Sequence, residues 1–148
     1  MDLGNWCVNQ KKVEEAERHA REAIRIHPDR AGAYGLLAVT LVQQDKWADL
    51  DAALAQGEKA DADNLLPYFR AANTCLARKT ELPRAERYFR KYLAQEPEGE
   101  TPNHAVTHWR LALVLEQEGR NPDSMVELKT AVRMDANSPA KADLKRLK

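Results

Sequence analysis

The sequence has little cysteine, few aromatic residues and no excess of charge of either sign. Its 148 residues include two cysteines and two phenylalanines, and 23 Lys and Arg residues balance 23 Asp and Glu residues. A protein that binds the phosphate backbone of nucleic acid is expected to carry a clustered basic excess. The balanced charge therefore predicts no nucleic-acid partner.

The sequence also lacks the features of secreted and membrane proteins. Cys7 and Cys75 are too few for a framework of several disulfides, and no Cys or His spacing indicates zinc. No run approaches 18 consecutive apolar residues, and the N-terminus has no basic segment followed by an apolar one. These absences predict a reduced, cytoplasmic protein without a membrane segment.

What the sequence does have is a repeat. A set of small or apolar positions with internal offsets of 4, 7 and 12 residues occurs four times, and each set closes at a proline or an alanine. The sets begin at Ala16, Leu50, Ala85 and Ser124, so they are 34, 35 and 39 residues apart. Steps of three and four place these positions on one helix face, and a period of this length predicts an array of helical units.

A second helical signature precedes each set. It pairs a large apolar residue with a small one, as in Leu37-Ala38-Leu41 and Leu111-Ala112-Leu115. In the third unit the choice is between Ala71-Ala72-Cys75 and Ala72-Asn73-Leu76, and the first is preferred because it avoids a polar residue at the helix contact. The turns that separate the two helices of each unit are predicted at 10–12, 44–46, 79–81 and 119–122.

These patterns resemble the tetratricopeptide repeat (TPR) family, whose 34-residue helix-turn-helix unit carries W-x2-L-G-x2-Y, A-x3-F and P positions. The closest stretches are 16–28 and 85–97, whereas Tyr34 and His108 stand where the family usually has Trp. The resemblance implies an all-α, right-handed α-solenoid of about four repeats with a C-terminal capping helix. We expect a single domain, 1–148, with repeats at approximately 1–30, 31–64, 65–99 and 105–137 and a capping helix at 138–148.

The first repeat opens only two residues before its signature at Leu3-Gly4-Cys7. This position is compatible with a piece excised from a longer protein. The cytoplasmic expectation holds only if no signal peptide, anchor or further domain lies upstream.

The sequence shows no arrangement typical of a catalytic site. His104 and His108 are four residues apart, which could place two imidazoles on one helix face, but no third ligand accompanies them. We interpret them as surface histidines, and Cys7 and Cys75 as packing residues in equivalent positions. No phosphate-binding glycine loop or nucleophile–base pair is present, so we predict no enzyme, no cofactor and no metal.

The first helix of each TPR unit lines an extended concave surface, so the resemblance implies a groove for a partner. Positions beside the buried stripe include Gly35 and Val42. The predicted groove residues are Leu36, Val39, Gln43, Arg70, Asn73, Trp109, Arg110, Leu113 and Gln117. An apolar floor below arginines suits an extended or helical partner that is partly hydrophobic and partly acidic. The alternative is that the aliphatic residues of this set complete the packing between neighbouring helices.

One binding mode of the family is poorly matched. The clamp that grips the C-terminal carboxylate of chaperones needs Lys, Asn and Arg side chains, and Met1, Leu36 and Leu66 fall where polar residues would be required. An apolar side chain cannot replace a donor to a carboxylate. The sequence therefore does not favour chaperone-tail binding.

The resulting prediction is a non-catalytic protein–protein interaction scaffold whose protein or peptide partner is unidentified. Pairs such as Glu17–Arg21 and Glu86–Arg90 are interpreted as stabilising contacts on solvated outer faces. The alternatives are a self-association module, forming a homodimer through Trp6, Val8 and Val13 of the N-terminal repeat, and a recruiting segment of a larger multi-domain protein.

Overall fold

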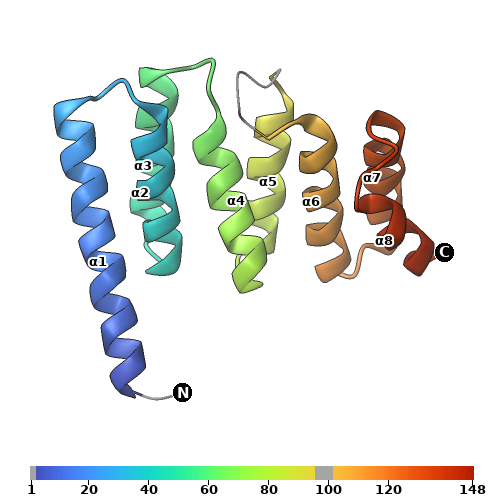
Figure 1. Cartoon of the computed structure of the whole chain (residues 1–148), viewed down its shortest axis with the longest axis horizontal. Helices are drawn as coiled ribbons and strands as arrows, with labels where there is room; N and C mark the ends of the chain where they lie inside the picture. The colour runs from blue at the N-terminus through green and yellow to red at the C-terminus, as the bar shows by residue number, and fades with distance from the viewer. Residues whose placement is uncertain (1–2, 96–101) are drawn as a thin grey trace. The chain divides into compact units, whose positions relative to one another are not determined.

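The computed structural model describes residues 3–95 and 102–148, with side chains described from Gln10 onward. Within these ranges the chain forms eight α-helices and no strand (Figure 1). None of the described helices combines the length and apolar character needed to span a membrane. The chain divides into two compact units, Met1–Thr74 and Cys75–Lys148.

The first unit contains α1 (Leu3–Ile26), α2 (Ala31–Gln43), α3 (Trp47–Ala60) and the first part of α4 (Leu66–Arg78). α1 packs on α2, and α2 packs on α3. Leu37, Ala38 and Leu41 of α2 and Leu50 and Leu54 of α3 are at most 2% exposed, so the predicted stripes form the core. Burying each large side chain of this kind contributes about 1.5–3 kcal/mol.

The turn predicted at 10–12 is wrong, because α1 continues through it without interruption for 24 residues. Gln10, Lys11 and Lys12 are all good helix formers, and none of them stops a helix as Gly or Pro would. The Gln10 amide also donates to the Glu14 carboxylate four residues later, at 3.4 Å. The first repeat therefore lacks its expected helix-turn-helix form.

The second unit contains the end of α4 followed by four helices, α5 (Leu82–Leu93), α6 (His104–Gln117), α7 (Asn121–Met134) and α8 (Ala140–Leu147). Consecutive helices from α5 to α8 pack on one another. Phe89, Leu111, Leu115 and Leu128 are at most 1% exposed and fill the space between these helices. The apolar positions of the last two sequence repeats thus make up the core of this unit.

The other three predicted turns are confirmed. They lie between α2 and α3, between α4 and α5 and between α6 and α7. Each contains a residue in the left-handed region, with φ of 58° at Asp45, 54° at Lys79, 50° at Glu81 and 79° at Gly119. Only glycine adopts this backbone conformation without a steric cost, so the two turns without glycine depend on the helix packing around them.

The third repeat and the C-terminus also follow the sequence prediction. Ala71, Ala72 and Cys75 have no exposed surface, which favours the preferred reading of the α4 signature. α8 falls within the predicted capping segment, and the Ser138 hydroxyl accepts the backbone N–H of Ala140 at its start. Ala140 is fully buried beside Leu128, so α8 covers part of the apolar surface of its unit.

Candidate functional site

In the first unit, five of the predicted groove residues lie on α2 and α4, and we call them the α2–α4 surface: Leu36, Val39, Gln43, Arg70 and Asn73. Leu36 is 36% exposed and Gln43 is exposed, whereas Val39 and Asn73 are half-buried. These residues are therefore at least partly accessible. The expectation is wrong for Gly35 and Val42, which are buried.

Arg70 explains why Gly35 is buried. A Cβ atom at Gly35 would lie 3.0 Å from Cδ and 3.3 Å from Nη1 of Arg70. The long side chain of Arg70 thus extends from α4 across α2, and the missing side chain at Gly35 gives it room. Arg70 was predicted to lie on this surface, but its contact with the backbone of Gly35 could not be predicted from the sequence.

Next to this surface the first unit has an open hollow of about 610 Å³. Its lining comes from the end of α1, the start of α2 and the segment before α4: Ala23, Asp29, Arg30, Ala31, Gly32, Ala33, Leu36, Asp61 and Asn64. Among the predicted site residues only Leu36 lines it. The sequence analysis did not include the others because they lie at or between helix ends, where the repeat pattern assigns turns rather than a surface.

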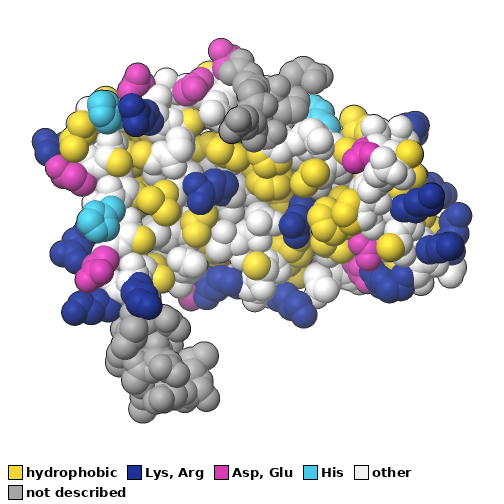
Figure 2. Space-filling view, viewed as in Figure 1, with side chains coloured by type: hydrophobic (Ala, Val, Ile, Leu, Met, Phe, Trp, Pro, Cys, Tyr) yellow, Lys and Arg dark blue, Asp and Glu magenta, His cyan; other side chains and the backbone are white. Residues whose placement is uncertain are grey.

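In the second unit the remaining predicted residues lie on α6, and we call them the α6 surface: Trp109, Arg110, Leu113 and Gln117. The first three are half-buried and Gln117 is exposed. Over α6, Figure 2 shows hydrophobic side chains beside a Lys or Arg side chain. Apolar and basic groups are therefore accessible together on this helix.

Trp109 is anchored from α8. Its indole N–H donates to Oδ2 of Asp143 at 2.8 Å, and its ring packs against the cluster that contains Leu128 and Ala140. The guanidinium carbon of Arg110 lies 4.6 Å from the centroid of the same ring, in cation–π geometry. Trp109 thus connects the capping helix to an arginine of the predicted site.

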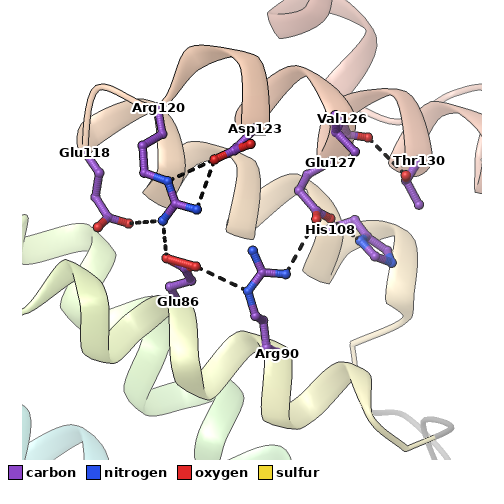
Figure 3. A network of polar contacts seen from close by, with 9 residues as sticks. All are labelled: Glu86, Arg90, His108, Glu118, Arg120, Asp123, Val126, Glu127 and Thr130. Carbon is purple, nitrogen blue, oxygen red and sulfur yellow. Dashed lines mark hydrogen bonds and ion pairs between the residues drawn. The ribbon is translucent and has the colours of Figure 1, made fainter.

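Another group of charged side chains joins α5 to α7 and to the turn before α7, and we call it the charge cluster: Glu86, Arg90, Glu118, Arg120, Asp123 and Glu127 (Figure 3). Arg120 contacts Glu86 at 2.6 Å and Asp123 at 3.0 Å. Arg90 contacts Glu86 at 3.3 Å and Glu127 at 3.8 Å. The carboxylates of Glu86 and Glu127 are 17% and 13% exposed, so the Glu86–Arg90 pair belongs to a partly buried network rather than to a solvated face.

One member of the charge cluster, Glu118, has a raised pKa. Burial raises the pKa of Glu118, and the negative charge of Glu86 raises it further, while the positive charge of Arg120, 3.9 Å away, lowers it. The physical cause is that a partly buried carboxylate lies beside a second one and shares its arginine. The ionised side chain of Glu118 therefore destabilises the folded state at neutral pH.

His104, His108 and Cys75 have separate surroundings in the structure. Nδ1 of His108 lies 2.6 Å from Oε2 of Glu127, and the His108 side chain is only 18% exposed, so its interpretation as an ordinary surface histidine is wrong. His104 begins α6, as predicted, and its Nε2 lies 2.6 Å from the backbone oxygen of Gln95. Cys75 is buried. Among the described residues, no three Cys, His, Asp or Glu side chains are grouped so that they could hold a metal ion.

Comparison with known proteins shows similarity in fold. No family model matches the sequence, and no curated protein matches it. A crystal structure of MamA covers 92% of this chain and 76% of its own, with a TM-score of 0.59 and 15% identity. Two further structures, MamA MSR-1 C2 and MamA AMB-1 P212121, have TM-scores of 0.58 and 0.56 and identities of 22% and 21%. They cover 87% and 96% of this chain and 71% and 74% of their own.

The chain has an all-helical repeat fold similar to that of MamA. This finding confirms the predicted fold class of an all-α solenoid. It also confirms the helical repeat read from the spacing of the apolar sets.

Proposed function

We propose that this chain belongs to the TPR family and acts as a non-catalytic scaffold that binds a segment of a partner polypeptide. The proposed contact residues are those of the α2–α4 surface in one unit and of the α6 surface in the other. Neither an enzymatic activity nor a cofactor is part of this proposal. A cytoplasmic location remains a prediction from the sequence.

The observation that carries the proposal is the α2–α4 surface. Leu36 combines an exposed aliphatic side chain with a position at the edge of the hollow in the first unit. Arg70 extends a guanidinium over the adjacent backbone of Gly35. Peptide-binding surfaces commonly combine an accessible apolar residue, which contributes affinity, with a charged side chain, which orients the peptide.

Selection from a displayed library of random peptides tests this function. We expect enriched peptides to bind the native chain and to lose affinity about tenfold or more for the double variant Leu36→Glu/Arg70→Glu, which removes the apolar contact and reverses the charge. The matched control is Ala55→Glu, which adds a carboxylate at an exposed position of α3 in the same unit.

Equal loss of affinity in the double variant and in the control would overturn this choice of surface. So would peptides that bind the double variant as tightly as the native chain. Circular dichroism of all three proteins must show the same helix content, so that a loss of binding reports the surface and not the fold.

A second candidate function is self-association, and the position of α1 favours it. Glu17 contacts Gln44 at 2.7 Å and Lys46 at 3.1 Å, and both residues lie in the turn that closes α2 against α3. The part of α1 that precedes these contacts extends past the ends of α2 and α3, as Figure 1 shows. A projecting helix of this length is marginal in water without a partner, and a second copy of the chain would supply one.

The homodimer is tested by sedimentation velocity over a range of protein concentrations. We expect a concentration-dependent dimer that Val13→Glu weakens, because Val13 is half-buried on α1 close to the projecting part. The other two residues predicted for this contact, Trp6 and Val8, lie outside the described side chains. A native chain that remains monomeric at every concentration would rule out the dimer.

A further inference from the structure

Arg110 has no polar partner among the residues that the structure describes. It makes no hydrogen bond or ion pair with any residue of the described ranges, and its Nε atom is shielded from solvent without an acceptor. A guanidinium carries five N–H donors, and a shielded donor without an acceptor costs free energy. Within the described part of the chain, Arg110 is therefore a donor group without an acceptor.

The position of Arg110 is nevertheless fixed. Its guanidinium stacks on the ring of Trp109 at 4.6 Å, and Trp109 is held by Asp143 and by packing against the buried cluster that contains Leu128 and Ala140. Stacking restricts the long side chain before any ligand arrives, so less conformational entropy is lost when one binds.

Two carboxylates of α6 and α8 are already occupied by other donors. Glu116 accepts two hydrogen bonds from Arg146, at 2.6 and 2.8 Å. Asp143 accepts from Trp109 and, at 3.2 Å, from Arg146. Both acidic side chains thus satisfy other donors, and within the described residues neither pairs with Arg110.

We propose that the stack of Arg110 on Trp109 is a binding site for an Asp or Glu side chain of the partner polypeptide. The carboxylate would accept from the two terminal Nη groups of Arg110, because the Nε atom is shielded. Leu113, one helical turn further along α6, would contact an apolar residue next to the acidic one. This inference rests on the proposed scaffold function and specifies the chemistry of its ligand.

A titration with defined peptides tests the site. The probe is a short capped peptide of alternating leucine and glutamate, and the comparison peptide has glutamine in place of glutamate. Binding is followed by Trp109 fluorescence in a Trp6→Phe/Trp47→Phe background, where Trp109 is the only tryptophan. We expect the glutamate peptide to bind at least about tenfold more tightly than the glutamine peptide, and its affinity to fall as salt is added.

The variants separate the stacked guanidinium from general positive charge. Arg110→Gln should lower the affinity for the glutamate peptide about tenfold or more, and Arg110→Lys should also lower it, because an ammonium lacks the planar pair of donors. Arg133→Gln, which removes an exposed arginine from α7 of the same unit, is the matched control and should change little.

Failure of the glutamate peptide to bind, or equal affinity of the two peptides, would overturn the inference, as would full affinity in Arg110→Gln. These outcomes differ from failure of the scaffold function. Displayed peptides that depend on Leu36 and Arg70 but not on Arg110 would support the scaffold function and refute the carboxylate site alone.

Discussion

Two charged regions of the second unit differ in the partners of their arginines. In the charge cluster, Arg120 and Arg90 each contact two or more carboxylates of neighbouring helices and turns. On the α6 surface, Arg110 contacts an aromatic ring and has no carboxylate among the described residues. The first arrangement satisfies charge within the chain, and the second leaves a guanidinium without a carboxylate.

This difference separates stability from binding. Ion pairs that link α5 to α7 can stabilise the unit, although each exposed pair contributes only about 0–1 kcal/mol. A guanidinium without an acceptor contributes little to stability and retains its capacity to bind a carboxylate. The charge cluster is thus interpreted as a structural feature and the α6 surface as the functional one.

We expect apolar packing, rather than ion pairs, to hold α6 against α7. Leu128 is 1% exposed and lies in the cluster with Ala112 and Ala131. We expect Leu128→Ala to lower the free energy of unfolding by about 2–5 kcal/mol, because it removes buried methyl groups and leaves a cavity. Chemical denaturation followed by Trp109 fluorescence measures this loss in the single-tryptophan background.

Val126→Ala provides the control for Leu128→Ala. Val126 lies on the same helix and is 60% exposed, so its truncation should change the free energy of unfolding by no more than about 0.5 kcal/mol. Similar losses in both variants would show that the apolar layer does not dominate the stability of this unit.

Glu17 of the first unit shows whether a carboxylate with several hydrogen-bond donors stabilises the fold. Burial alone would raise the pKa of Glu17, but hydrogen bonds from Arg21, Gln44 and Lys46 lower it from an ordinary value of 4.5 to about 2. Because the folded pKa is the lower one, this stabilisation is present above about pH 4.5 and is lost as the pH falls toward 2. The Glu17 side chain is 13% exposed.

We expect Glu17→Gln to lower the free energy of unfolding by about 1–2 kcal/mol at neutral pH, after allowance for solvent screening. The difference from the native chain should shrink as the pH falls from about 4.5 toward 2. Denaturant titrations at a series of pH values measure it, and a difference that does not depend on pH would contradict the assigned role of the Glu17 charge.

Glu118 should behave in the opposite way. Its pKa is raised by burial and by Glu86, so the ionised group opposes folding at neutral pH and the penalty disappears once the pH falls below the ordinary carboxyl value. We expect Glu118→Gln to raise the free energy of unfolding by up to about 1 kcal/mol at neutral pH, and by less in acid. Destabilisation at neutral pH would show that the contact of Glu118 with Arg120 outweighs the repulsion from Glu86.

Much of the fold could be predicted from the sequence because the apolar sets recur at a nearly constant period. That period located three turns and the capping helix, and it assigned residues such as Leu41, Leu111 and Leu128 to the core. The continuity of α1 was missed because spacing alone does not reveal whether a polar stretch such as 10–12 bends the chain.

The site was only partly predictable, since its contacts join residues far apart in the sequence. Arg110 and Trp109 were both placed on the predicted surface. Their stacking depends on Asp143, which holds the indole from 34 residues away. The bond between His108 and Glu127 likewise depends on the register between α6 and α7, which no repeat pattern specifies.

The smallest expected effect on stability is that of Arg110→Gln. Because Arg110 has no carboxylate partner among the described residues, its removal sacrifices only the stacking on Trp109, and an exposed cation–π contact contributes about 0.5–1 kcal/mol. Removing the unpaired Nε donor offsets part of that loss. We expect a net change within about 0.5 kcal/mol in thermal or denaturant unfolding, together with the loss of affinity for the glutamate peptide. A destabilisation above 1 kcal/mol would place Arg110 with the charge cluster, as a residue that the fold requires.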